Sequence, residues 1–172
     1  MRVSATEADW SREIPRKFWD PGRKLLRSIR RYQALRGQRG FMARIARRRW
    51  KLEHQFWSLV TQCEIQLDTR IGGGLLINHP NGIVIHPDAI IGPNCLIFNQ
   101  VTIGMGRPAD DGRTTPIIGG HVDIAAGARI VGGVTIGDHV LIGLNSVVLK
   151  DVPKGGVAVG VPARVVRIAP GD

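Results

Sequence analysis

Residues 118–148 read IGGHVDIAAGARIVGGVTIGDHVLIGLNSVV, and an aliphatic residue returns at every sixth position of this stretch. A period of six is a multiple of the two-residue period of a β-strand, so the repeated side chains point to one face. The same spacing extends upstream, and the positions of this grid are Ile65, Ile71, Ile77, Ile85, Ile91, Ile97, Ile103, Ile118, Ile124, Ile130, Ile136, Ile142 and Val148. A short repeat of this kind is typical of a parallel β-helix, in which stacked coils share one core.

The residues between the grid positions support the same interpretation. Many grid positions are followed directly by glycine, and small or β-branched residues lie four places on, as at Ala89, Cys95 and Ala128. Three short strands with tight corners form a triangular coil, whose corners need small residues or positive φ. An antiparallel sandwich would space its strands by about 8–12 residues. The sequence therefore predicts a mainly β fold, a parallel β-helix of about five coils.

The grid is interrupted twice, and we expect the chemistry at these interruptions. The first adds two residues around His79, between Ile77 and Ile85. The second inserts a loop at residues 104–117, which reads GMGRPADDGRTTPI. Its Gly, Pro and Asp residues are typical of an exposed loop. Loops that leave a rigid scaffold often build binding and catalytic sites.

The N-terminal third differs in composition from the repeats. The chain has 172 residues and a net charge of +10, and residues 1–60 hold 16 of its 24 Lys and Arg residues but only 5 of its 14 acidic residues. Eight of the nine aromatic residues also lie there. We expect a basic helical segment over residues 1–61, followed by a β-helix domain over residues 62–168.

Two helices are predicted in the N-terminal segment from its apolar spacing. The first covers residues 22–36, and the residues expected on its apolar face are Leu25, Leu26, Ile29, Tyr32 and Leu35. The second runs from Phe41 to about Thr61, and the residues expected to face inward are Ile45, Leu52, Phe56 and Val60. We expect these helices to cap the open end of the β-helix and to help it oligomerise.

Other partners and settings follow from the charge and the cysteines. A basic amphipathic segment could instead make a peripheral contact with an anionic membrane surface. The run Arg47–Arg49 could be a nucleic-acid patch, but no nucleic-acid-binding fold accompanies it, so no nucleic acid is expected. No run of about 18 apolar residues and no secretory h-region appears. Cys63 and Cys95 are too few for a disulfide scaffold. We expect a cytoplasmic protein, or one peripheral at the inner membrane face.

Residues 63–166 resemble the hexapeptide-repeat acyltransferases, and within them the serine acetyltransferase branch with its relatives that acetylate sugars in exopolysaccharide synthesis. The segments that carry the resemblance are CEIQLDTRIGGGLLINHPNGIVI (63–85), CLIFNQVTIG (95–104), IAAGARIVGGVTIG (124–137), IGLNSVVLKDVP (142–153) and VGVPARVV (159–166). The resemblance implies a left-handed β-helix, although crossover connections are otherwise right-handed. It also implies acetyl-CoA as co-substrate, no metal, and a homotrimer or dimer of trimers with sites between subunits.

The resemblance implies that His79 is the general base of an O-acetyltransferase. Histidine suits this role because its ordinary pKa lies near working pH. Glu64 occupies the position of the family's aspartate, 15 residues before the histidine, and would orient the imidazole. Glu64 is one methylene longer than that aspartate, and Asp68 is the alternative partner.

Two positions of the acceptor site depart from the serine-binding pattern. The loop histidine that holds the serine carboxylate in the family corresponds to Thr115, and the aspartate that meets the serine amine corresponds to Asn78. Both differences remove charge, which favours a sugar or saccharide-precursor hydroxyl as acceptor, in polysaccharide biosynthesis. Serine is the alternative acceptor, since Arg113 lies close enough in sequence to compensate in part.

The resemblance also places CoA in a groove along the outside of the coils. The matching positions are Gly104, Ala126 and Leu144, while Lys150 and Arg164 suit its phosphates. Two rival functions stay open. A scaffold without enzymatic activity predicts no CoA binding, and a hexapeptide carbonic anhydrase would use His79, His86 and His121 as metal ligands across a subunit interface. The spacing of these histidines does not match that metal-binding pattern.

Overall fold

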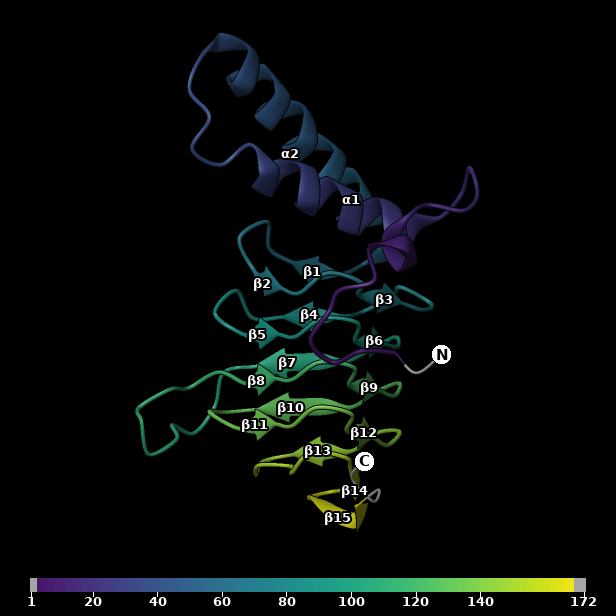
Figure 1. The fold of residues 1–172 in the computed structure, drawn as a ribbon, viewed down its shortest axis with the longest axis vertical. Coiled ribbons are helices and arrows are strands. Elements are labelled where there is room, and N and C mark those ends of the chain that lie inside the picture. Colours follow the sequence, from purple (N-terminus) through teal and green to yellow (C-terminus); the bar gives the residue numbers. More distant parts are fainter. Residues whose placement is uncertain (1–2, 169–172) are drawn as a thin grey trace.

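The computed structural model describes residues 3–168 as a helical head on top of a stack of short strands (Figure 1). The head consists of a 3-10 helix, η1 (Trp10–Glu13), and the helices α1 (Pro21–Ala34) and α2 (Phe41–Thr61). The first predicted helix is therefore found within two residues of its expected ends, and the second has the expected ends. We call residues 1–61 the head and the strands below it the β-helix.

The strands form three sheets that we name after their first strands. The β1 sheet contains β1 (Glu64–Ile65), β4 (Val84–Ile85), β7 (Thr102–Gly104), β10 (Arg129–Val131) and β13 (Val147–Val148). The β2 sheet contains β2 (Arg70–Ile71), β5 (Ile90–Ile91), β8 (Ile117–Ile118) and β11 (Thr135–Ile136). The β3 sheet contains β3 (Leu76–Ile77), β6 (Leu96–Ile97), β9 (Asp123–Ile124), β12 (Leu141–Ile142), β14 (Gly156–Gly160) and β15 (Ala163–Ile168).

The aliphatic grid stacks on itself through the whole β-helix. In the β1 sheet, for example, Ile85 pairs with Ile103, and Ile103 pairs with Ile130, in parallel register. Every grid residue is buried, with at most 8% of its surface exposed. The three faces therefore enclose one aliphatic core, and the predicted left-handed β-helix is confirmed. Only the final pair, β14 and β15, is antiparallel.

The chain turns between the sheets at three edges of the prism, which we call the β1/β2, β2/β3 and β3/β1 edges. The β2/β3 edge has one left-handed residue in each coil: Gly74, Asn94, His121, His139 and Gly155. The β3/β1 edge has left-handed residues at Gln62, Gly82, Gln100, Gly127 and Asn145, and a further one at His79. Asn and His tolerate positive φ better than most side chains, which explains why polar residues interrupt the aliphatic pattern here. The loop between β7 and β8 leaves from the β1/β2 edge and projects from the prism (Figure 1).

Helix α1 lies between α2 and the first coil, so it caps the β-helix as predicted (Figure 1). Its buried face includes Leu25, Leu26 and Ile29. Gly22 sits so close to the coil that a Cβ there would lie 2.9 Å from the carbonyl oxygen of Ile77. Arg30 donates hydrogen bonds to the carbonyls of Ile71 and Gly72 at 2.6 and 2.7 Å.

The predicted inward face of α2 is wrong. Ile45, Leu52, Phe56 and Val60 are 46%, 66%, 53% and 37% exposed. The helix packs on α1 through its other side, where Trp57 is buried and Glu53 accepts a hydrogen bond from Arg27 at 2.6 Å. The prediction assumed that the apolar face of α2 is the covered one. Among the described residues α1 is the only helix beside α2, and it covers the opposite side.

Residues 4–9, which bend at positions 5–7, lie along the outside of the β2/β3 edge (Figure 1), and we call them the N-terminal strap. Asn94 holds it from the second coil, because its side-chain amide donates to the carbonyls of Ser4 and Glu7 at 2.7 Å each. The side-chain oxygen of Asn94, Oδ1, accepts a hydrogen bond from the backbone N–H of Asp9 at 2.8 Å. Further down, Ala5 lies against Gly120 so closely that a Cβ on Gly120 would collide with it.

Candidate functional site

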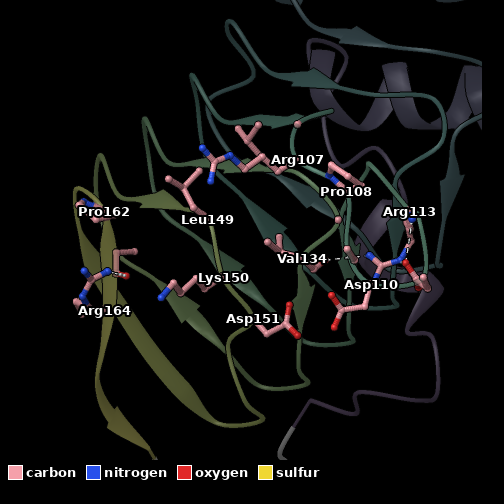
Figure 2. A pocket seen from close by; sticks show the side chains of 16 residues that line it. Arg107, Pro108, Asp110, Arg113, Val134, Leu149, Lys150, Asp151, Pro162 and Arg164 are labelled. Atoms are coloured by element: carbon pink, nitrogen blue, oxygen red, sulfur yellow. Dashed lines mark hydrogen bonds and ion pairs between the residues drawn. The ribbon is translucent and has the colours of Figure 1, made fainter.

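The loop between β7 and β8 forms one wall of a pocket of about 970 Å³ on the β1/β2 edge. The opposite wall comes from Leu149–Asp151 and from Pro162–Arg164 at the end of the β-helix. Figure 2 shows Lys150 and Arg164 at one end of this pocket and Asp110 and Arg113 at the other. The volume is at the upper end of the usual range for small-molecule and cofactor sites, about 300–1,000 Å³.

Charges of both signs line the pocket, with cations in excess. Its basic residues are Arg107, Arg113, Lys150 and Arg164, and its acidic residues are Asp110, Asp111 and Asp151. Asp151 accepts a hydrogen bond from the backbone N–H of Thr135 at 2.7 Å, so this carboxylate supports the wall. Lys150 and Arg164 make no ion pair with another described residue, which leaves them available to an anionic ligand such as a phosphate.

Arg113 is already engaged by its own loop. Its guanidinium donates to the carbonyls of Thr115 and Val134 at 3.0 and 3.2 Å. It also pairs with Asp111 at 3.4 Å. The pKa of the Asp111 carboxyl is lowered, chiefly because it accepts a hydrogen bond from the backbone N–H of Arg113. Arg113 therefore closes the loop on itself, and a carboxylate ligand would have to compete with these contacts.

His79 lies on a different edge from this pocket. It follows β3 on the β3/β1 edge, where the two extra residues let the chain bulge outward, and it adopts a left-handed φ of 53°. The side chain is exposed. Its neighbour Asn78 is half-buried and is fixed by a backbone hydrogen bond to Ile97 at 3.1 Å. The imidazole is thus presented to solvent, as a base that meets an incoming substrate requires.

The two acids considered as partners of His79 behave differently. Glu64 begins β1, is exposed, and within residues 3–168 makes no hydrogen bond or ion pair with His79. It lines a small cavity of about 300 Å³ beside His54 and Ser58, below α2. Asp68 is paired with Arg36 of the head instead. The role of Glu64 in orienting the His79 imidazole therefore stays a prediction.

The predicted CoA positions divide between two edges. Ala126 and Leu144 lie in the turns of the β3/β1 edge, the edge of His79, and Leu144 is 70% exposed. Gly104 ends β7 on the β1/β2 edge, next to the pocket loop, and its carbonyl accepts from Gly132 at 3.1 Å. The β1 sheet, one full face of the prism, lies between Ala126 and Leu144 on the first edge and Gly104 on the second. One chain therefore does not bring its base and its pocket together.

The acceptor position Thr115 is buried, with 5% of its surface exposed, and its hydroxyl donates to the carbonyl of Asp88 at 3.3 Å. It fixes the base of the loop to the neighbouring coil. The hydroxyl carries no charge, so this position offers no cation to a carboxylate in the observed conformation.

Neither cysteine suits covalent catalysis. Both thiols are buried, as predicted for Cys95, and burial raises the pKa of Cys95 to about 11 and also raises the pKa of Cys63. A nucleophilic cysteine needs a lowered pKa and access to substrate. These two side chains are part of the core.

The histidines of the carbonic anhydrase alternative are far from forming a set within one chain. His79, His86 and His121 lie on the β3/β1, β1/β2 and β2/β3 edges respectively. His121 instead contacts His139, with 2.8 Å between their Nδ1 atoms. Over residues 3–168, no three His, Cys, Asp or Glu side chains are grouped so that they could hold a metal ion.

Sequence reasoning missed three residues that line the pocket. Arg107 and Asp110 line the pocket, and the only signal was their place in the loop that interrupts the grid. Pro162 closes the pocket from the C-terminal hairpin, where the motif VGVPARVV had drawn attention only to Arg164. A separate question is membrane insertion, and no helix in the described part of the chain has the length and apolarity to span a bilayer.

Comparisons with known proteins identify relatives of the β-helix. No family model matches the chain. The serine acetyltransferase of Synechococcus elongatus is 43% identical over 108 residues, which are 63% of this chain and 44% of that protein. A serine acetyltransferase solved in complex with CoA is 30% identical, with a TM-score of 0.69 over 87% of this chain and 58% of the other. The soybean serine acetyltransferase complexed with serine is 35% identical, with a TM-score of 0.69, over 85% of this chain and 57% of the other. The chain spans about half the length of the curated relatives it matches.

Proposed function

From its kinship with serine acetyltransferases through the β-helix, we propose that this chain is an acetyl-CoA-dependent O-acetyltransferase of the hexapeptide-repeat type. The observation that carries the proposal is the 43% identity over 108 residues with a serine acetyltransferase. A solved relative binds CoA on the same fold. The pocket of this chain has the size and the unpaired cations that a phosphate-bearing co-substrate needs.

In the proposed reaction, His79 accepts the proton of the acceptor hydroxyl. The oxygen attacks the thioester carbonyl carbon of acetyl-CoA, and the tetrahedral intermediate then collapses. The C–S bond breaks, the acetyl ester forms, and the CoA sulfur leaves with the proton that the imidazole held. Direct transfer fits this chain because both cysteines are buried with raised pKa values and cannot carry the acetyl group. Lys150 and Arg164 are assigned to the CoA phosphates, and Gly104, Ala126 and Leu144 to the groove beside its pantetheine arm.

The division of the site between two edges supports a trimer. In a threefold assembly the β3/β1 edge of one subunit would face the β1/β2 edge of the next, which would join His79 to a neighbouring pocket. Glu64, on the face between them, would then lie where the imidazole is used. Mixing and reassembling two inactive variants, His79→Ala and Lys150→Glu with Arg164→Glu, is expected to restore part of the activity. If each chain used only its own residues for catalysis, mixing the two variants would restore no activity.

Serine is the acceptor that the comparisons favour, ahead of the sugar favoured by the sequence pattern. The relatives reported above are all named serine acetyltransferases. None of them supports a sugar. The sequence-based preference for a sugar rests on Asn78 and Thr115. Thr115 is uncharged, and Arg113 is held by contacts with which a serine carboxylate would have to compete. A sugar or saccharide-precursor hydroxyl is therefore the second candidate.

The acceptor is tested by measuring thiol release from acetyl-CoA with the full chain, against serine and a panel of free and nucleotide-linked sugars. Turnover with serine alone would establish the first candidate and remove the second. The double variant Asn78→Asp, Thr115→His restores the charges of the serine pattern. It should lower the KM for serine if these positions meet the acceptor, and an unchanged KM would remove them from the site. No thiol release with any acceptor, together with no CoA binding, would favour the scaffold alternative.

A further inference from the structure

The outward face of α2 carries an apolar stripe that no described element covers. Phe41, Ile45, Leu52, Phe56 and Leu59 recur three, four or seven residues apart, so they share one side of the helix. They are 74%, 46%, 66%, 53% and 79% exposed. We call these five residues the α2 stripe. Scattered exposed apolar residues are normal, but a contiguous set marks an interaction surface.

Aromatic side chains extend the stripe at its C-terminal end. The ring of Phe56 lies 4.9 Å from that of Trp57, which in turn contacts Trp19 edge-on at 5.6 Å. Phe18, next to Trp19, is 90% exposed. The Nζ atom of Lys24 lies 4.8 Å from the Phe18 ring. Aromatic rings beside basic groups are the side chains that favour the headgroup layer of a membrane.

Basic residues surround the stripe, and their charge is not neutralised within the helix. The basic residues of α2 are Arg44, Arg47, Arg48, Arg49 and Lys51. The only acid of the helix, Glu53, is paired with Arg27 of α1. Arg48 and Arg49 fall three and four residues after Ile45, within the apolar face itself. Their aliphatic stems can lie along the stripe while the guanidinium groups reach an anionic layer.

The charge decides between two occupants of this surface. A second copy of the chain would bring the same positive helix against itself, and like charges repel across a desolvated contact. An anionic lipid surface offers complementary charge and an apolar layer for the stripe. Because no described helix can span a bilayer, the helix would lie in the plane of the interface.

We propose that the α2 stripe and its arginines dock the protein on an anionic lipid surface. The surface is separate from the pocket, since the head lies on the first coil (Figure 1) and none of the residues that line the pocket belongs to the head. The inference therefore does not depend on the proposed acetyl transfer.

The test is co-sedimentation of the full chain with vesicles. Binding is expected with phosphatidylcholine vesicles that contain phosphatidylglycerol, should weaken as salt is raised, and should be absent with phosphatidylcholine alone. Leu52→Gln is expected to lower the partition coefficient about tenfold through lost apolar burial. Arg48→Gln is expected to lower it about fivefold. Val166→Gln is the matched control, an exposed valine of β15, 62% exposed, which should leave binding unchanged.

Three controls keep the outcome unambiguous: the fold of the head, thiol release and self-association. Tryptophan fluorescence and far-UV circular dichroism must show that each variant keeps the folded head, and thiol release must be unchanged. Sedimentation velocity without vesicles reports self-association. Absence of binding to the anionic vesicles, or binding that Leu52→Gln and Arg48→Gln leave intact, would overturn the proposal. Self-association that Leu52→Gln abolishes, without vesicle binding, would assign the stripe to a second copy instead and would equally overturn it.

Discussion

The ion pair between Glu13 and Arg30 joins three parts of the molecule, so its loss should loosen the head from the β-helix. The Arg30 guanidinium donates to both carboxylate oxygens of Glu13, at 3.0 and 2.8 Å, and to two carbonyls of the first coil. The carboxylate also accepts from the backbone N–H of Leu75 at 3.1 Å. The side chains of Arg30 and Glu13 are only 18% and 7% exposed, respectively.

The magnitude follows from what each replacement leaves unpaired. Arg30→Met leaves the Glu13 carboxylate buried with a single donor, Leu75, so the loss should approach the range for breaking a buried pair, about 3–5 kcal/mol. Glu13→Leu leaves Arg30 with its two carbonyl acceptors and some access to water. Its cost should be lower, about 1–3 kcal/mol. The double variant should be more stable than the sum of the two losses predicts, by about 0.5–3 kcal/mol.

The assay uses the position of the tryptophans. All four, Trp10, Trp19, Trp50 and Trp57, lie in the head, so their fluorescence reports unfolding there. Far-UV circular dichroism follows the whole chain. In a urea titration the fluorescence midpoint of Arg30→Met should fall further than the midpoint seen by dichroism. If the stability lost in the double variant equals the sum of the two single losses to within about 0.3–0.5 kcal/mol, the two residues are not coupled and the reasoning is refuted. Equal shifts of both signals would refute the local character of the effect.

Three further predictions concern the core, the base and the half-buried His54. Ile103→Ala, in the middle of the β1 sheet, should cost about 2–5 kcal/mol and Ile103→Val about 0.5–1.5 kcal/mol in urea denaturation, and equal costs would contradict the stacked core. His79→Ala should lower kcat by about 10²–10⁴ with the best acceptor, whereas His139→Gln, on the β2/β3 edge, should not; near-normal turnover of His79→Ala would remove it as the base. The Nε2 N–H of His54 donates to the Ile65 carbonyl at 2.8 Å, and desolvation by partial burial lowers the pKa of His54 from 6.5. The unfolded chain therefore binds a proton that the native chain does not, so the free energy of unfolding should decrease as pH falls below about 6.5. That decrease should be smaller in His54→Gln, and an identical pH dependence would show that His54 does not cause it.

The period of the aliphatic residues was enough to predict the β-helix, because each grid residue has only one way to reach the core. A slip of one position would turn Ile103 outward and its neighbour Thr102 inward. The location of the bulge at His79 and of the loop at residues 104–117 followed from the same count. Helix ends were predictable as well, since Gly40 and the switch of period after Thr61 bound α2.

The long-range arrangement was not predictable, and α2 shows the reason. Its apolar spacing was correct, but a pattern states only that a face is apolar and not what covers it. The partner of Glu13 lies 17 residues away and the partner of the strap, Asn94, lies more than 80 residues away. Such polar contacts leave no periodicity in the sequence. The role of Glu64 stays a prediction, since within residues 3–168 of one chain it makes no hydrogen bond with His79.

The N-terminal strap changes how this repeat protein is expected to open and to fold. In an ordinary repeat stack each unit touches only its neighbours, so units at either end separate first. Here residues 4–9 bind the second coil at Asn94 and reach the third at Gly120, which makes the first three coils one cooperative block. Fraying is then left to the C-terminal coils. During synthesis residues 4–9 are made before the coils that hold them, and they must wait for Gly120, about ten seconds at usual elongation rates. The strap is therefore placed only after the third coil has been made.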